Sequence, residues 1–301
     1  MQAVLLRETG GPEVLNVEEI DRPEPAEGQV LIEVHAVSVN PIDWKYRSGM
    51  MPKQLPVILG NDISGIVISS RAEGYEPGDE VFGFAASGGY AEYATANPSS
   101  IAKKPADITH EQAAALPVGA LTAWQALFDH GDLQAGQTAL IAGAAGGVGH
   151  FAIQLAKHAG AKAVGIGSAR NRDFVIGLGA SDYIDYATQD VATAVSDVDL
   201  AFDTVGGAST LALLETVRSG GVLVLIANAP PEQEAAKRGV RAVLFSMTPT
   251  SEQLAKVAEL VSSGELHVEI AEVLPLAEVR RAHELSESGH TRGKLILTVA
   301  H

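Results

Sequence analysis

The sequence of 301 residues contains no cysteine, few aromatic residues and no long apolar run. Without cysteine the chain has no disulfide, no thiolate nucleophile and no thiolate zinc site. No apolar stretch approaches the roughly 20 residues that span a membrane, and residues 3–6 are too short an apolar segment for a signal peptide. We therefore expect a cytoplasmic protein that has no membrane partner.

Basic residues are also scarce, since 21 Lys and Arg stand against 37 Asp and Glu, a formal net charge of −16. Such a charge repels phosphate backbones, so we do not expect nucleic acid as a partner. The chain lacks the P-loop motif of kinases, the G-x-S-x-G elbow of hydrolases and the Tyr-x-x-x-Lys pair of short-chain reductases. Its length is sufficient for two domains with separate cores.

The most informative segment is a glycine-rich run, Ala142-Gly143-Ala144-Ala145-Gly146-Gly147-Val148-Gly149. An apolar segment at residues 138–141 precedes it and a helical pattern at 151–158 follows, which predicts a strand, a turn and a helix N-terminus able to bind a pyrophosphate. Ala144 replaces the first glycine of G-x-G-x-x-G, which is tolerable if its φ is negative. A plain turn between strand and helix is the alternative. On the first interpretation the cofactor contacts are Ala145, Gly146, Gly147 and Val148, and Gly149 lets the helix pack closely on its strand.

The segments that follow alternate between two patterns. Helical patterns at residues 171–178 and 209–217 lie among short apolar segments at residues 162–166, 183–184, 198–202, 221–226 and 240–245. This alternation predicts an α/β domain of the Rossmann type, a doubly wound parallel sheet with helices on both faces.

The choice of dinucleotide depends on the end of the second predicted strand, where NAD sites place an acidic residue. This chain has no carboxylate there, but Ser168, Arg170 and Arg172. Cations in the first turn of a helix are unfavourable unless an anion lies nearby, which points to the 2′-phosphate of NADPH. The hydroxyl of Tyr186 would close the phosphate pocket. Alternatively, both arginines are solvated and pair with surface carboxylates, and Tyr186 only packs.

Before residue 115 the pattern changes to strands separated by Pro and Gly turns. The strands are expected at residues 29–40, 57–59, 65–69, 80–82 and 90–94, which predicts a compact, strongly bent β-barrel. A last strand at 293–299, after a helix at 276–288, has no place in the nucleotide sheet and returns to the barrel. We therefore predict a barrel domain of residues 1–114 plus 266–301 and a dinucleotide-binding domain of residues 115–265.

Nine short motifs carry a family resemblance because they occur in order along nearly the whole chain. They are residues 39–43, 59–65, 78–81, 88–93, 113–117, 121–124, the glycine turn, 203–207 and 292–294. Together they resemble the medium-chain dehydrogenase/reductase superfamily, and within it the zinc-free, NADPH-dependent quinone oxidoreductase branch to which zeta-crystallin belongs. The resemblance implies a GroES-like β-barrel domain into which the Rossmann domain is inserted.

The resemblance also implies further cofactor contacts. Thr122 would lie near the nicotinamide amide, and Ile226 and Ala227, at a strand tip, would touch the same ring. The family motifs place four more residues at the cofactor: Pro41, Thr204, Val205 and Lys294.

Zinc alcohol dehydrogenases of this superfamily carry a cysteine and a histidine where this chain has Asn40 and Asn61. Asparagine is a poor zinc ligand, so we predict no catalytic metal. The spacing of the remaining histidines suggests no replacement site. We expect His283 and His290, seven residues apart, to be solvated.

Without zinc, reduction depends on positioning and on a hydrogen-bond donor near the oxygen that gains charge. The candidates are Asn40, Lys45, Tyr46 and Arg47, on the loop expected after the strand at 29–40. Alternatively, Lys45 and Arg47 are surface charges and Tyr46 is a packed ring. Met50 and Met51 stand where relatives carry a tyrosine, which suggests an apolar pocket mouth.

The predicted function is NADPH-dependent reduction of a small quinone or an α,β-unsaturated carbonyl compound. The alternative is a non-catalytic NADPH-binding protein with a structural or regulatory role, because both need the glycine turn and the arginines. The apolar strand near residues 240–245 would be an exposed edge of the sheet unless paired, so we expect a homodimer.

Overall fold

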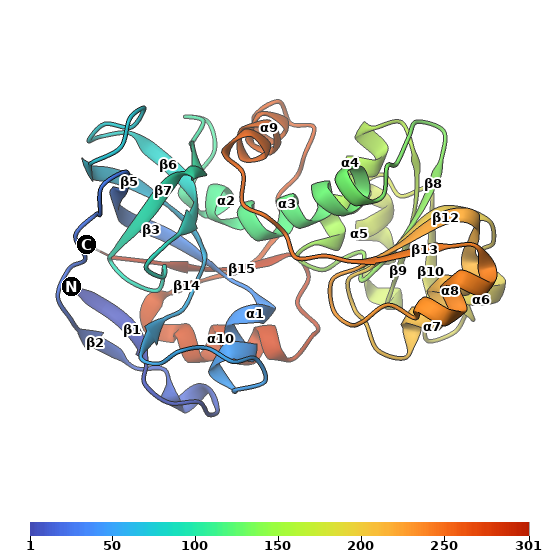
Figure 1. The fold of residues 1–301 in the computed structure, drawn as a ribbon, viewed down its shortest axis with the longest axis horizontal. Helices are drawn as coiled ribbons and strands as arrows, with labels where there is room; N and C mark the ends of the chain where they lie inside the picture. Colours follow the sequence, from blue (N-terminus) through green and yellow to red (C-terminus); the bar gives the residue numbers. More distant parts are fainter. Residues whose placement is uncertain (301) are drawn as a thin grey trace. The chain divides into compact units, whose positions relative to one another are not determined.

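The structure is a computed structural model and describes residues 1–300. It divides into two compact units (Figure 1). Unit 1 comprises residues 1–118, 249–264 and 268–300, and unit 2 comprises residues 119–248 and 265–267. The segment 249–264, which we placed in the dinucleotide-binding domain, lies in unit 1 because its amphipathic helix α9 (Ser251–Ser262) packs on strand β7 (Tyr93–Lys103).

Unit 1 is built mainly of antiparallel strands. Its other strands are β1 (Gln2–Leu6), β2 (Val17–Glu19), β3 (Val30–Val39), β4 (Val57–Ile58), β5 (Asp62–Ser70), β6 (Glu80–Ala85), β14 (Ile270–Pro275) and β15 (Lys294–Thr298). Its other helices are α1 (Pro41–Arg47), α2 (His110–Ala115) and α10 (Val279–Glu287). The main sheet has the order β14-β15-β3-β5-β6-β7, and β3 also pairs with β7, so the central strands close into a barrel as predicted. The C-terminal strand β15 pairs with β3, which confirms its return to this unit.

Strand β7 is longer than the predicted strand at 90–94 and runs through Pro98. Residues 93–96 pair with β3 and residues 101–103 with β6. Ala96 also pairs with Ala85 of β6, so Pro98 falls in the bend of β7 where the register with β6 shifts. Its missing N–H is not needed at that bend.

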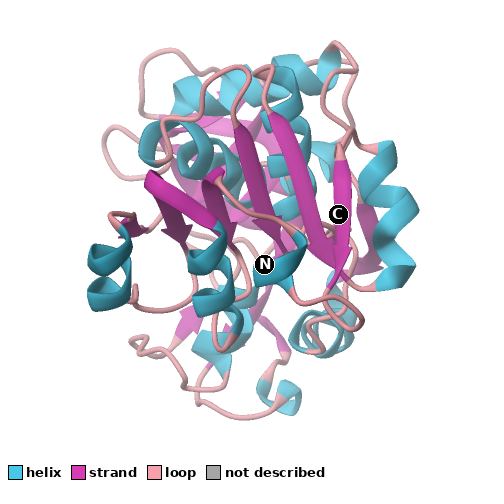
Figure 2. Ribbon diagram, turned by 90° about the vertical axis from the view of Figure 1, so that its right-hand side faces the viewer, coloured by secondary structure: helices cyan, strands magenta, loops and turns pink. Residues whose placement is uncertain are grey.

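Unit 2 holds a parallel sheet with the order β10-β9-β8-β11-β12-β13. The strands are β8 (Thr138–Ala142), β9 (Lys162–Gly167), β10 (Asp182–Asp185), β11 (Val198–Asp203), β12 (Val217–Leu225) and β13 (Arg241–Leu244). The helices are α3 (Pro117–Trp124, which begins in unit 1), α4 (Gly149–His158), α5 (Arg172–Gly177), α6 (Val191–Ala194), α7 (Ser209–Thr216) and α8 (Glu232–Arg238). Helices lie on both sides of the strands (Figure 2). This confirms the doubly wound parallel sheet predicted from the sequence, and the strand order puts its switch point between β8 and β11.

Candidate functional site

The glycine turn lies at the switch point of the parallel sheet, directly after β8. Gly143 has φ +68°, and a Cβ on Gly149 would meet the carbonyl oxygen of Gly143 at 2.2 Å. Gly149 therefore permits the close packing of α4 that we predicted. Among residues 1–300 only Asp132 and Asp197 combine a side chain with positive φ, so Ala144 has the negative φ that its place in the motif requires.

Gly146 is less crowded than Gly149. A Cβ there would meet only the Gly143 carbonyl oxygen, at 3.2 Å, and Gly146 has no left-handed φ. Helix α4 begins after Val148, whose side chain does not cap it. A bare turn beside uncapped N–H groups is the arrangement that accepts a pyrophosphate, so this segment fits a dinucleotide.

A second loop at the same edge of the sheet follows β11. The hydroxyl of Thr204 donates to the carbonyl oxygen of Ala142 at 2.7 Å and so joins the two loops. The buried carboxylate of Asp203 accepts from the backbone N–H of Val205 and Gly206, at 3.0 and 2.8 Å. Val205 is thereby held on the surface, 61% exposed.

Sequence reasoning gave no role to Asp203 or to Asn228. The side-chain oxygen of Asn228 accepts from the backbone N–H of Gly207 at 3.2 Å, and Asp203 also accepts from the hydroxyl of Thr210 at 2.6 Å. Both residues fix the loop that carries Thr204 and Val205. The available signal was an Asp at the tip of an apolar strand, followed by glycines.

The residues predicted to bind the 2′-phosphate lie together after β9. Tyr183 donates to the carbonyl oxygen of Ser168 at 2.8 Å and fixes this turn. Arg170 and Arg172 are exposed; Arg170 lies in a 3-10 turn directly before α5, and Arg172 begins α5, whose first turn has no side-chain cap. Tyr186 is 58% exposed beyond the next strand, so its hydroxyl is not part of the packing of the unit.

The residues assigned to the nicotinamide differ in exposure. Ile226 is half-buried and Ala227 exposed, at the tip of β12. Thr122 lies in α3 and is buried.

The residues assigned to the acceptor lie in unit 1, where Asn40 stands between β3 and the next element and is 2% exposed. Its Oδ1 accepts from the ammonium of Lys294 at 2.6 Å, and its Nδ2 donates to Oδ2 of Asp62 at 3.0 Å. Lys294, assigned to the cofactor by resemblance, therefore has its side chain buried against Asn40 and Asp62. Burial raises the pKa of Asp62 and lowers that of Lys294, and the attraction between them opposes both shifts.

The segment after Asn40 is the helix α1, not a loop as predicted. Pro41 occupies its first position and is exposed, and Asp43 accepts from the backbone N–H of Asn40 at 2.8 Å. Both features favour helix initiation. Burial raises the pKa of Asp43 to about 6.

The three candidates in α1 have different environments. Tyr46 packs against the core of unit 1, with Nζ of Lys53 4.7 Å from the centre of its ring. Lys45 is half-buried, with its Nζ 5.8 Å from the ring of Trp44. Arg47 is 1% exposed and its Nη2 pairs with Glu287 at 2.7 Å, so it is not a surface charge, and its Nε and Nη1 are buried without a hydrogen-bond partner among the described residues.

The expectation that His283 is solvated was wrong. Its side chain is fully buried in α10, where Nε2 lies 3.2 Å from the hydroxyl of Tyr90. His290 is exposed, as expected. Burial is the main reason that the pKa of His283 falls to about 3, and the nearby Arg47 charge acts in the same direction.

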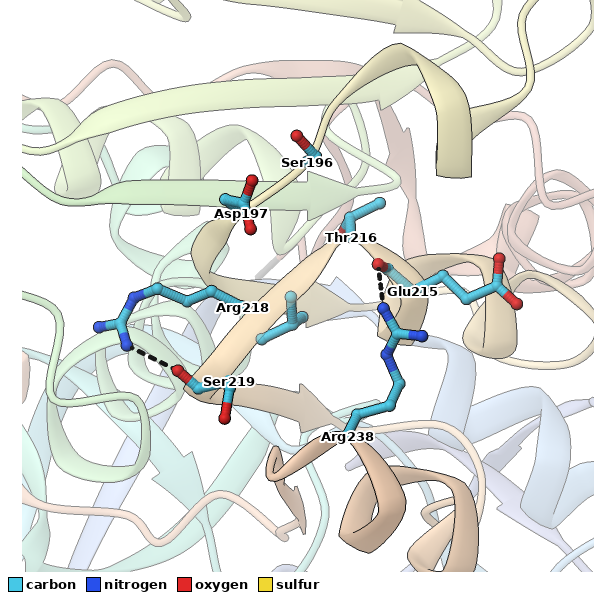
Figure 3. Close-up of a pocket in the computed structure, with 8 residues that line it drawn as sticks. Ser196, Asp197, Glu215, Thr216, Arg218, Ser219 and Arg238 are labelled. Carbon is cyan, nitrogen blue, oxygen red and sulfur yellow. Dashed lines mark hydrogen bonds between the residues drawn. The ribbon is translucent and has the colours of Figure 1, made fainter.

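A pocket of about 420 Å³ opens at the other end of the parallel sheet, where β12 begins (Figure 3). It contains none of the predicted site residues. Its two arginines have partners, because Arg218 donates to Asp199 and to the Ser219 carbonyl, and Arg238 donates to the Glu215 carbonyl. The pocket therefore does not replace the switch point as the candidate site.

Within the described part of the chain, no three His, Asp or Glu side chains gather in a way that would hold a metal ion. Helices long and apolar enough to cross a membrane are also not found among residues 1–300. The prediction that the reaction needs no zinc stays a prediction.

Two family models match the chain. The alcohol dehydrogenase GroES-like domain matches residues 26–106, and a model described as zinc-binding dehydrogenase matches residues 178–297. The second description names zinc. This chain has Asn40 and Asn61 where zinc alcohol dehydrogenases of the superfamily carry a cysteine and a histidine.

Several relatives match this chain over nearly its whole length. Human quinone oxidoreductase is 33% identical, over 99% of this chain and 97% of its own length. The structure of the quinone oxidoreductase from Coxiella burnetii superposes with a TM-score of 0.94 at 36% identity, covering 100% of this chain and 99% of that one. The Escherichia coli quinone oxidoreductase complexed with NADPH gives a TM-score of 0.92 at 30% identity, covering 99% and 100%.

A GroES-like barrel joined to a doubly wound nucleotide-binding sheet defines a medium-chain dehydrogenase/reductase. The chain belongs to the quinone oxidoreductase family of that superfamily.

Proposed function

We propose that this protein is an enzyme that uses NADPH to reduce a small-molecule quinone or an α,β-unsaturated carbonyl compound. One observation carries the proposal: the glycine turn and the Thr204 loop meet at the switch point of a parallel sheet, in a chain similar over its whole length to quinone oxidoreductases. Ligands of such sheets bind at that edge.

NADPH, when bound, supplies the hydride. The turn from Ala145 to Val148 holds the pyrophosphate with backbone N–H groups, and Ser168, Arg170 and Arg172 hold the 2′-phosphate. Thr204 and Val205, with Pro41, Thr122, Ile226 and Ala227, hold the rest of the cofactor. Among the described residues, the absence of any non-neighbouring side chain within 4 Å of a Cβ on Gly146 and the exposure of both arginines support this assignment.

The acceptor's oxygen becomes more negative as hydride arrives, and a donor fixed beside it lowers the barrier. We assign this role to the Nδ2 of Asn40, whose amide is fixed by Asp62 and Lys294. Tyr46 and Lys45 are the second choices, because each already packs against a neighbouring side chain.

The experiment that tests this function follows nicotinamide absorbance with a panel of quinones, enones, acrylates and aldehydes. Turnover of a quinone or an enone supports the proposal. Firm NADPH binding with no hydride transfer to any compound would favour the alternative, a non-catalytic NADPH-binding protein.

A homodimer is part of the proposal. Strand β13 is an edge of the parallel sheet, where it pairs with β12 and with no other strand of residues 1–300, and Leu244 on it is 48% exposed. Pairing two copies of β13 about a two-fold axis would cover this edge.

We also propose that the protein is located in the cytoplasm, which fractionation of cells expressing the protein would test.

A further inference from the structure

Three neighbouring strands of unit 1 bring Asn40, Asp62 and Lys294 together in a closed polar cluster, the Asn40 cluster. Leu295 of β15 pairs with Val39 of β3, so Lys294 lies beside Asn40, and Asp62 begins β5 on the other side of β3. The ammonium of Lys294 also lies 3.7 Å from Oδ2 of Asp62, which closes the ring. The three side chains are no more than 4% exposed.

The cluster fixes which way the Asn40 amide faces. An ammonium only donates and an ionised carboxylate only accepts, so Oδ1 must face Lys294 and Nδ2 must face Asp62. A flipped amide would put Oδ1 against the carboxylate and Nδ2 against the ammonium. Two charged neighbours therefore impose a single orientation on a side chain whose two ends otherwise differ little in shape.

The cluster also leaves bonding capacity unused. Nδ2 carries two hydrogens, and only the bond to Asp62 uses one of them among the described residues. The other carboxylate oxygen, Oδ1 of Asp62, is buried and has no hydrogen-bond partner there. Oδ2 instead accepts a second bond, from the backbone N–H of Val118 at 3.2 Å, which holds the carboxylate in place.

We infer that Lys294 and Asp62 are positioning residues, which act through Asn40 by holding its second Nδ2 hydrogen toward the acceptor's oxygen. The inference rests on the proposed function and assigns Lys294 a role other than the cofactor contact that the resemblance implies. It explains why a lysine is buried here: its charge orients the amide, and the adjacent carboxylate compensates the charge.

The test compares Lys294→Met, Asp62→Asn and the control Lys103→Met. Methionine keeps the length of Lys294 without its charge, and an amide at 62 offers a donor as well as an acceptor, so each variant removes one of the two charged groups that orient Asn40 and holds its amide less firmly. Lys103 is an exposed lysine of the same unit that pairs with Asp79. We expect kcat for quinone reduction to fall by about 10- to 100-fold in the first two variants, the cost of a misplaced group, and to stay unchanged in the control. The Kd for NADPH should stay within twofold in all three.

The double variant Asn40→Ala/Lys294→Met distinguishes positioning from an independent role. If Lys294 acts through Asn40, its loss has no further effect on kcat once Asn40 is gone. In ¹⁵N-labelled protein, the side-chain amide signals that Asn40→Ala removes should shift in Lys294→Met and Asp62→Asn but not in Lys103→Met, a readout independent of turnover.

Three results would overturn the inference: an unchanged kcat in both Lys294→Met and Asp62→Asn, equal losses in the presence and absence of Asn40, or a raised Kd for NADPH with kcat unchanged. Asp62→Asn carries the test if Lys294→Met does not fold. An inactive wild-type protein would instead refute the proposed function and the inference with it, and the wild type is measured in the same assay.

Discussion

The hydroxyl of Tyr90 lies 3.2 Å from Nε2 of His283, although 193 residues separate them in the chain. The contact ties the C-terminal helix α10 to the barrel core, and it buries an imidazole next to the charge of Arg47. A buried neutral histidine makes stability depend on pH.

We predict that His283 lowers the free energy of unfolding in acid. Its pKa is about 3 when folded and 6.5 ordinarily, so the unfolded chain takes up a proton that the folded protein refuses. Its contribution is complete above pH 6.5 and is lost as the pH falls toward 3, by up to about 1.4 kcal/mol per pH unit. Urea titrations of His283→Gln, which keeps a polar atom for Tyr90, should show a weaker decline than the wild type.

Asp43 gives the opposite trend between about pH 6 and 3.8, because its raised pKa makes the folded protein hold a proton there. The wild type and the variant share Asp43, so their difference isolates the histidine. The exposed His290→Gln serves as the control. Parallel pH curves for wild type and His283→Gln would contradict the prediction.

Cofactor preference provides the second prediction. NADPH should bind more tightly than NADH by about 1–3 kcal/mol, the contribution of charge-assisted hydrogen bonds to the 2′-phosphate. Arg170→Ala and Arg172→Ala should weaken NADPH binding and leave NADH nearly unchanged in calorimetric titrations. Arg238→Ala, at the opposite end of the same sheet, is the matched control. Equal affinities of the wild type for the two cofactors would refute this prediction.

The third prediction concerns zinc. Because Asn40 and Asn61 stand at the ligand positions, turnover should survive exhaustive chelation, and elemental analysis should find less than one zinc ion per chain. The expectation fails if the protein contains one zinc ion per chain and loses turnover when it is removed.

The fourth prediction concerns assembly. Light scattering at micromolar concentration should give the mass of a dimer, and Leu244→Lys should shift it toward the monomer because a charge blocks edge pairing. Ile176→Lys changes an exposed apolar residue elsewhere on unit 2 and should not alter the mass. A wild-type monomer would rule out the β13 dimer.

Asn40 provides the last prediction. Loss of one donor to a developing oxyanion costs about 2.7–4 kcal/mol, so Asn40→Ala should lower kcat by about 10²- to 10³-fold with NADPH affinity close to wild type. Asn97→Ala, an exposed asparagine of the same unit, should have wild-type kcat. A much smaller effect at Asn40 would transfer the role to Tyr46 or Lys45, which Tyr46→Phe and Lys45→Met would reveal.

The parallel sheet was predictable because each strand is a short apolar run between helical patterns, and the glycine turn marks the first strand of a dinucleotide-binding domain. Helix α1 was missed, although Asn40, Pro41 and Asp43 form a helix-start signal that was available in the sequence. It is short, and it directly follows a long β-branched strand.

The burial of His283 and the partners of Lys294 were not predictable in the same way. Each depends on a residue more than 190 positions away in the chain, Tyr90 for one and Asn40 for the other. Periodicity and spacing describe neighbours along the chain, so they do not reveal contacts that only the folded sheet creates.

Strand β15 has a consequence for the order in which the protein matures during synthesis. It lies between β14 and β3 inside the sheet of unit 1, yet residues 294–298 are translated after nearly all the rest of that unit. The strands of unit 2, in contrast, are all made by residue 244. All strands of the nucleotide-binding sheet therefore leave the ribosome before β15 does. The sheet of unit 1 is completed only after β15, which includes the lysine that orients Asn40, has been synthesised.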